Sequence, residues 1–270
     1  MFLILFKLIS SIPLFILRFF SNFLAFWLLI TNSQQKNTTQ QNLKHIGLQN
    51  KISLTTSLIF SSETFFEYPF LWGRPNNFKK LVECSVKEPF QNSSKPKLIF
   101  TLHMGCVDAM LFFVSSMVDN LNIIFTPAKN KSLDTAIKKI RERRGAKLHP
   151  ANPRGMNAFL KSFIKKENII IATDLVPHNT GKYSTFFGKE CFSIDLIEKL
   201  SKKGTHDLYF AYFSKGTQKK YKLNIESVEN FISTDEMNKH FERAIRINPE
   251  MYGWEYKKFR KLPGSKTNIY

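Results

Sequence analysis

Cysteine is scarce in this 270-residue chain, which contains only Cys84, Cys106 and Cys191. The number is odd, the three are widely spaced, and no CxxC pair occurs. This pattern indicates neither a disulfide framework nor a zinc site. We therefore expect no metal, and we expect the main domain to lie in a reducing, cytoplasmic environment.

Several common catalytic motifs are also missing. The sequence has no Walker loop, no Rossmann glycine fingerprint, no HExxH and no GxSxG. Nucleotide-dependent, nicotinamide-dependent, zinc-protease and serine-hydrolase chemistry therefore lack the residues on which they depend. No resident cofactor is implied.

Acidic side chains are outnumbered, with 21 Asp and Glu against 40 Lys and Arg and a formal net charge of +19. Such an excess in a folded domain points to a polyanionic partner, which could be nucleic acid, an anionic bilayer or a phosphorylated substrate. Charge alone does not choose among them. Because no nucleic-acid-reading module accompanies the charge, we expect no nucleic acid partner.

Residues 1–30 are dominated by Phe, Leu and Ile, but Lys7 and Arg18 interrupt the run. No clean stretch of about twenty apolar residues remains, so the segment could lie in the membrane interface or span with a tilt. No small-x-small cleavage site precedes the polar residues that follow. We predict a retained membrane anchor over residues 1–30 and, since neither a repeat nor a linker divides the rest, one domain over residues 31–270.

The remaining chain alternates helical and strand patterns, which predicts an α/β fold with a mixed, mostly parallel sheet flanked by helices. Residues 31–42 are polar and are expected to form a surface connection. Expected helices cover residues 43–70, 106–116, 132–144, 159–166 and 235–247. Expected strands cover residues 97–102, 122–125, 168–173, 208–213 and 222–225.

His103 and Asp108 form the first candidate site. His103 ends an expected strand, and Asp108 lies about one turn into the helix that follows, beyond a turn at Gly105. A carboxylate bonded to one ring nitrogen fixes the imidazole tautomer and leaves the other nitrogen free to accept a proton from an attacking hydroxyl. The pattern alone is common by chance, so the surrounding motifs must support it.

Arginines and a second aspartate supply further candidates. In the expected helix over 132–144, Arg141 lies at the edge of the apolar stripe and Arg144 lies within it. A guanidinium at either position suits phosphate binding. Arg143 is expected to be solvated. Asp174 follows an expected strand, at the sheet edge where α/β proteins bind ligands, although a turn role before a proline is equally compatible. Residues 186–188 (FFG) are expected to pack in the core.

Four blocks together resemble the bacterial lipid A lauroyl/myristoyl acyltransferase family, within the wider glycerolipid acyltransferases. They are TLHMGCVD, KNKSLDTAIKKIRERRGAKL, IATDLVPHNTGKYSTFFGK and MNKHFERAIRINPEMYGWEYKKFR, which occur in the family's order. The resemblance covers roughly residues 41–262. It implies a glycerolipid-acyltransferase-like fold and transfer of an acyl group to a hydroxyl.

The resemblance also implies roles and partners. His103 would be the general base with Asp108 as its carboxylate partner, Arg141 would bind phosphate or the reacting carbonyl region, and Asp174 would support the site. The donor would be acyl carrier protein or an acyl-CoA thioester, and the acceptor a phosphorylated lipid A precursor. Family members lie on the cytoplasmic face of the bacterial inner membrane.

Some positions depart from the family pattern. The usual Asn-Trp-Glu after His-x-Gly is replaced by Cys106, Val107 and Asp108, Arg144 stands where an aromatic residue is usual, and Leu175 replaces a common Gln. These changes leave two alternatives open: the same chemistry on a glycerophospholipid, aminolipid or other glycolipid, or a catalytically inactive relative that binds lipid at the membrane.

Overall fold

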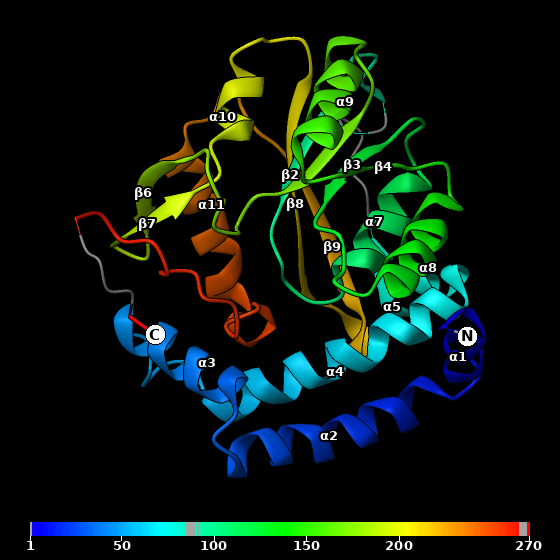
Figure 1. Cartoon of the computed structure of the whole chain (residues 1–270), viewed down its shortest axis with the longest axis vertical. Helices are drawn as coiled ribbons and strands as arrows, with labels where there is room; N and C mark the ends of the chain where they lie inside the picture. Colours follow the sequence, from blue (N-terminus) through cyan, green and yellow to red (C-terminus); the bar gives the residue numbers. More distant parts are fainter. Residues whose placement is uncertain (1, 85–89, 91, 265–268) are drawn as a thin grey trace.

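The computed structural model describes residues 2–84, 90, 92–264 and 269–270. A seven-stranded sheet lies among helices, with a separate two-stranded hairpin beside it (Figure 1). The strands of the large sheet are β1 (Val82–Cys84), β2 (Lys97–Thr101), β3 (Asn122–Phe125), β4 (Lys147–Pro150), β5 (Ile169–Ala172), β8 (Asp207–Lys215) and β9 (Tyr221–Ser227). The hairpin consists of β6 (Lys182–Phe186) and β7 (Lys189–Ser193).

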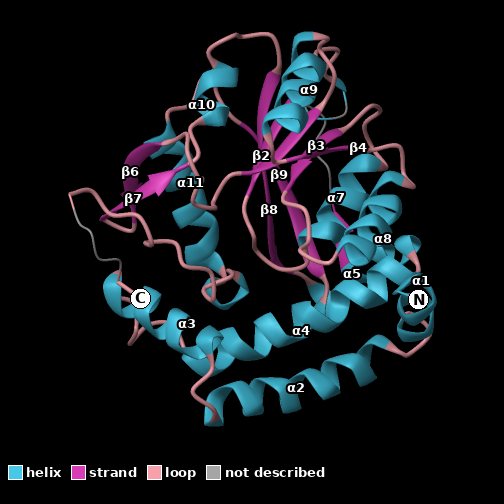
Figure 2. Cartoon of the chain, in the orientation of Figure 1, coloured by secondary structure: helices cyan, strands magenta, loops and turns pink. Residues whose placement is uncertain are grey.

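Helices surround the sheet and extend below it (Figure 2). The α-helices are α1 (Phe2–Ile9), α2 (Leu14–Ile30), α3 (Gln34–His45), α4 (Leu54–Gly73), α5 (Phe78–Leu81), α7 (Val107–Ser115), α8 (Lys131–Glu142), α9 (Pro153–Ile164), α10 (Leu196–Ser201) and α11 (Thr234–Ile247). Three short 3-10 turns are η1 (Pro75–Asn77), η2 (Thr217–Lys219) and η3 (Pro249–Met251).

The large sheet has the order β1-β9-β8-β2-β5-β3-β4. All neighbouring pairs are parallel except β8 and β9, which are antiparallel. Strands β2 and β5 lie at the centre, and their apolar runs KLIFT and IIIA are almost wholly buried, as expected for strands covered on both faces. The predicted mixed, mostly parallel α/β sheet flanked by helices is confirmed.

Several local expectations differ from the structure. The helix expected over residues 43–70 is interrupted, because α3 ends at His45 and α4 begins at Leu54. Residues 31–42 are not a surface connection, because most of them belong to α3, which begins after the Ser33 cap and buries Thr38, Thr39 and Asn42. Strand β4 was not expected, since the run KLHP is too short and polar to show strand periodicity. The expected helix over 159–166 begins earlier, at Pro153, where the Asn152 side chain caps the first turn.

The N-terminal helices lie along one edge of the molecule, with α2 running beside α4 (Figure 1). Among the described residues, only α1 and α2 taken together, across a bend of 107°, have the length and hydropathy of a bilayer span; no single helix does. Helix α1 contacts α4 closely: a Cβ at Gly73 would lie 1.9 Å from the Phe6 carbonyl oxygen. The anchor over residues 1–30 thus remains a prediction.

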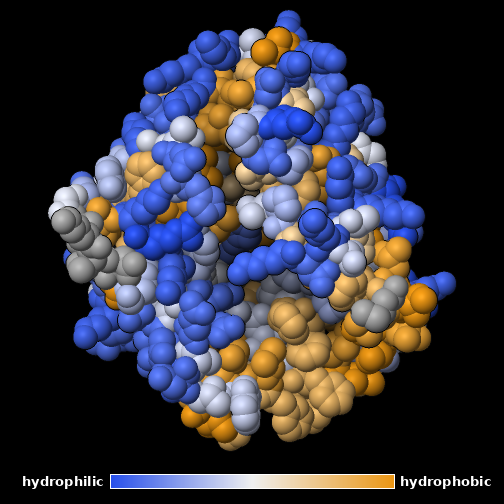
Figure 3. Space-filling model, in the orientation of Figure 1, coloured by the Kyte–Doolittle hydropathy of each residue, from blue (hydrophilic) through white to orange (hydrophobic). Residues whose placement is uncertain are grey.

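The same edge carries much of the exposed apolar surface, seen at the bottom of Figure 3. Helix α2 buries Leu17, Ser21 and Ala25 and leaves its other side bare. The exposed face of α2 consists of Phe15, Phe19, Phe20, Phe23, Phe26, Trp27 and Ile30. Large exposed apolar patches are typical of protein or membrane interaction surfaces.

Asn42 ties α3 to the C-terminal tail and gives a test of the fold. Its side-chain nitrogen donates to the carbonyls of Trp254 (2.6 Å) and Tyr256 (2.8 Å) from a fully buried position. Asn42→Ala removes the donor to the buried Trp254 carbonyl and one of the two donors to the Tyr256 carbonyl, which also accepts from the Lys258 N–H, so the free energy of unfolding should fall by about 1–3 kcal/mol. Denaturant titration measures this, and the exposed neighbour Gln40→Ala should change it by less than about 0.5 kcal/mol.

Candidate active site

His103 and Asp174 meet because they follow adjacent parallel strands. Thr101, the last residue of β2, pairs in register with Ala172, the last residue of β5. His103 and Asp174 each lie two residues further on, so both emerge at the same carboxyl edge of the sheet. This edge is where open α/β sheets bind their ligands.

The Asp174 carboxylate holds His103 at two points. Nδ1 of the imidazole lies 2.8 Å from Oδ1, and the backbone N–H of His103 donates to Oδ2 at 3.1 Å. The Asp174 side chain is 2% exposed, whereas that of His103 is 40% exposed. Because an ionised carboxylate only accepts, Nδ1 carries the proton, and Nε2, which has no partner among the described residues, is left as an acceptor.

The electrostatics of the pair follow from this contact. Burial opposes the charged imidazolium, but the Asp174 carboxylate and its hydrogen bond, helped by Asp108, outweigh burial and raise the pKa of His103 above 6.5. Burial alone would raise the pKa of Asp174, but His103 and the buried Lys258 lower it below 3.8. The Lys258 ammonium also donates to the Asp174 carbonyl at 2.7 Å. The carboxylate therefore stays ionised.

Asp108 does not hydrogen-bond His103, which corrects the expected pairing. Its buried carboxylate instead accepts from Nε (3.0 Å) and Nη2 (2.8 Å) of Arg141 and from the indole Nε1 of Trp72 (2.6 Å). The expectation rested on chain proximity, but α7 turns the carboxylate toward α4 and α8. Asp108 still lies near enough to help raise the pKa of His103, without direct contact.

Arg141 and Trp72 border a hollow beside this network. Its volume is about 230 Å³, and it is lined by Tyr68, Trp72, Phe125, Thr126, Ala128, Asp134, Ile137 and Arg141. Arg141 is fixed by Asp108 through Nε and Nη2, while its Nη1 has no hydrogen-bond partner in the described parts of the chain. A mainly apolar hollow with one oriented guanidinium suits a chain that carries an anionic or carbonyl oxygen.

Arg144 lies apart from this network. It follows α8, stacks on Phe78 at 4.8 Å, and donates from Nη1 to the Asn76 side chain at 2.7 Å. The helical wheel misplaced it, because α8 ends at Glu142 and the chain turns before Arg144. The structure therefore separates Arg144 from His103, Asp108, Arg141 and Asp174.

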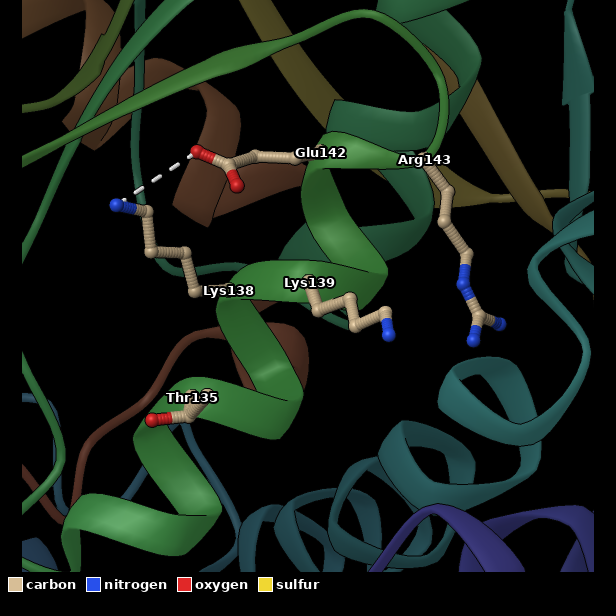
Figure 4. Close-up of a pocket in the computed structure, with 5 residues that line it drawn as sticks. All are labelled: Thr135, Lys138, Lys139, Glu142 and Arg143. Carbon is tan, nitrogen blue, oxygen red and sulfur yellow. Dashed lines mark ion pairs between the residues drawn. The ribbon is translucent and has the colours of Figure 1, made fainter.

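The outer face of α8 is basic. Thr135, Lys138, Lys139, Glu142 and Arg143 line a shallow hollow of about 400 Å³ (Figure 4). Glu142 faces Lys138 at 3.9 Å, while Lys139 and Arg143 extend away from that pair. This hollow shares no lining residue with the hollow beside Arg141, and neither His103 nor Asp108 lines it.

The C-terminal tail holds the loop that carries His103. Gly105, at φ +69°, donates its N–H to the Met251 carbonyl at 2.9 Å, and Gly253 donates to the His103 carbonyl at 3.1 Å. Met104 forms a bridge with Tyr252. These contacts join segments about 150 residues apart, so local sequence patterns did not indicate them.

The remaining candidates have structural roles. Burial raises the pKa of the Cys106 thiol well above its ordinary value, which keeps it an unreactive thiol. Phe186 and Phe187 are buried, which confirms the expected core packing. Within the described ranges, no group of three or more His, Cys, Asp and Glu side chains could hold a metal ion.

The model of one protein family, bacterial lipid A biosynthesis acyltransferase, matches residues 56–261, which is most of the chain. The chain belongs to this family. No curated protein matches it. Membership in the lipid A biosynthesis acyltransferase family makes the chain an acyltransferase and confirms the resemblance seen in the four sequence blocks.

The His103 titration tests the geometry of the site. In Asp174→Asn the charge that raises the pKa of His103 is lost while burial remains, so that pKa should fall below its wild-type value. NMR titration of the six histidine rings, with the His103 signal assigned by its loss in His103→Gln, measures it.

Asp134→Asn is the matched control. Its carboxylate accepts from the backbone of Ala128 and does not touch His103. The pKa of His103 should stay at the wild-type value in this variant. An unchanged pKa in Asp174→Asn would contradict the pairing.

Proposed function

We propose that this acyltransferase moves a fatty acyl group from an acyl carrier protein thioester to a hydroxyl of a lipid A precursor, with His103 as the general base. The observation that carries the proposal is the oriented imidazole: Asp174 binds Nδ1 and leaves Nε2 free at an accessible position. Family membership supplies the reaction class and the lipid A context.

The reaction needs no covalent enzyme intermediate. Nε2 of His103 takes the proton of the acceptor hydroxyl as its oxygen attacks the thioester carbonyl carbon. The tetrahedral intermediate collapses, the carbon–sulfur bond breaks, and the imidazolium returns the proton to the leaving thiolate. Asp174 stabilises the imidazolium throughout, because its carboxylate stays ionised.

Arg141 supplies positive charge beside the base. Trp72 donates a hydrogen bond to Asp108, and Asp108 in turn binds Nε and Nη2 of Arg141. Nη1 of Arg141 is therefore available to an anionic oxygen. That oxygen belongs to a phosphate of a substrate or to the polarised thioester carbonyl. The adjoining apolar hollow takes part of an acyl chain.

The donor binds near α8 in this proposal. Acyl carrier protein is acidic, and the outer face of α8 presents Lys138, Lys139 and Arg143 on the same helix that carries Arg141 to the site. Complementary charge of this kind steers association. A carrier protein seated there would have its thioester arm directed past α8 toward His103.

We further propose that α1 and α2 seat the protein on the cytoplasmic face of the bacterial inner membrane, lying in the interface. The exposed face of α2 would enter the acyl boundary. Basic groups flank it: Arg74 donates to Ser11 between α1 and α2, and the lysine-rich turn between β8 and β9 meets Arg18 of α2. Anionic lipid headgroups suit such a rim.

Acyl transfer tests the proposed function. Purified, detergent-solubilised protein should transfer acyl groups from carrier-protein thioesters to a lipid A precursor, and His103→Ala should lower kcat by about 10²–10⁴-fold, since the base is lost. The rate should rise with pH as His103 loses its proton, with a midpoint above 6.5 because its pKa is raised. His178→Ala, at an exposed histidine, should leave the rate unchanged.

The same assay with coenzyme A thioesters, and with glycerophospholipid and aminolipid acceptors, distinguishes the donor and acceptor. Transfer only to another lipid would keep the chemistry and overturn the acceptor. Transfer indifferent to His103→Ala, or none to any hydroxylated lipid, would overturn the proposed function.

Vesicle binding tests the membrane face. Phe19→Ser with Phe23→Ser removes two rings from the exposed face of α2; each buried ring contributes about 1.5–3 kcal/mol, so partitioning onto vesicles containing phosphatidylglycerol should fall at least about tenfold. Flotation measures it. Phe231→Ser, at an exposed ring outside α1 and α2, should have no effect, and equal partitioning of all variants would exclude this face.

A further inference from the structure

A buried ion pair joins α2 to the body of the protein. Arg18 donates from Nη2 (2.6 Å) and Nε (3.0 Å) to Oε1 of Glu67 on α4, and its Nη2 also reaches the Lys219 carbonyl at 2.9 Å. The Glu67 side chain is 1% exposed and that of Arg18 11% exposed. A carboxylate so buried is held in its ionised form only while its counter-charge stays in place.

Glu67 is also joined to the sheet. The hydroxyl of Tyr221, the first residue of β9, donates to Oε2 of Glu67, the oxygen that Arg18 does not use. The Tyr221 ring is buried and stacks on Phe213 at 4.8 Å. Glu67 therefore fixes both α2 and Tyr221 at once.

Tyr221 in turn packs against the loop between His103 and Asp108. A Cβ built on Gly105 would lie 2.6 Å from Cε1 of Tyr221, so the ring touches the Gly105 backbone with no room for a side chain. Gly105 is the left-handed residue, at φ +69°, that turns the chain from His103 into α7. A shift of the Tyr221 ring toward Gly105 must displace this turn, and a shift away from Gly105 removes the packing that supports it.

We infer that Arg18, Glu67 and Tyr221 are positioning residues that hold the Gly105 turn, and through it His103 and Asp108, in register with Asp174 and Arg141. The geometry of the reaction centre then depends on the seating of α2, the helix whose other face is the exposed apolar surface. This inference rests on the proposed role of His103.

The chain contains a second Arg–Glu–Tyr arrangement that serves as a matched control. Arg243 of α11 pairs with Glu226 of β9, and the Tyr212 hydroxyl donates to the same carboxylate at 2.8 Å. Tyr212 is buried, while Arg243 and Glu226 are partly exposed, and this arrangement has no described contact with the turn at Gly105. We therefore expect its loss to leave the position of His103 unchanged.

The test compares Arg18→Met and Tyr221→Phe with Arg243→Met and Tyr212→Phe, in the full chain in detergent. Arg18→Met and Tyr221→Phe should lower kcat by about tenfold or more with little change in KM, because a small displacement of the reacting groups is enough. The control pair should stay within about twofold, as expected for residues with no contact to the site.

A rescue separates positioning from lost stability. Arg18→Met with Glu67→Gln removes both charges, and the introduced amide still accepts from the Tyr221 hydroxyl, so kcat should recover most of what Arg18→Met alone loses. The pH dependence of His103 modification by diethyl pyrocarbonate gives a readout that does not need turnover. In Arg18→Met the pKa of His103 should fall, because the contact with Asp174 lengthens.

An unchanged kcat and an unchanged His103 titration in Arg18→Met and Tyr221→Phe would overturn the inference, as would equal losses in the control pair. Losses that merely follow the folded fraction measured by thermal unfolding would also overturn it. If the wild type transfers no acyl group, the proposed function fails, while the His103 titration still decides the positioning role.

Discussion

The hydrogen bond from Nδ1 of His103 to Asp174 is the contact on which the reaction centre depends. It joins the ends of two neighbouring parallel strands, so the sheet itself sets the separation and direction of the two groups. His103 and, to a lesser extent, the buried Lys258 lower the pKa of Asp174 and keep it ionised, and Asp174 in turn raises the pKa of His103 and makes the imidazole a stronger base. A single buried contact thereby fixes the tautomer, the charge and the orientation of the proposed catalytic group.

Asp108 takes a different part in the same site. Its carboxylate orients Arg141 and Trp72, which places a guanidinium next to the mainly apolar hollow. His103, the proposed base, and Arg141 are thus held by two separate carboxylates. In the proposed reaction, this separation would allow proton transfer at His103 while Arg141 remains charged.

Much of the fold was predictable from sequence. The apolar runs of β2, β3 and β5 and the amphipathic pattern of α8 and α11 indicated an α/β sheet, and the structure confirms it. Strand order was not predictable, because period-two patterns do not reveal which strands are neighbours. The sequence placed Asp174 at the correct sheet edge. Its contact with His103 was missed because the sequence does not show that β2 and β5 are neighbours.

Other site residues were beyond local patterns. Trp72 and the Arg18–Glu67–Tyr221 group act through partners far along the chain and lie outside the four sequence blocks. Lys258 lies within the fourth block, but nothing in that block indicates its contact with Asp174. Arg18, a charged residue within the largely apolar run of residues 1–30, was an available indication. The family match identifies the class of reaction. It does not identify the long-range contacts that position the groups facing the substrate.

The most direct test of this account is the ¹⁵N chemical shift of each ring nitrogen of His103 in detergent-solubilised protein, recorded above its pKa. The account predicts a neutral imidazole that is protonated at Nδ1 and unprotonated at Nε2, the nitrogen proposed to accept the proton of the acceptor hydroxyl. Protonation at Nε2, with Nδ1 bare, would contradict the pairing with an ionised Asp174 and remove His103 as the base in this arrangement.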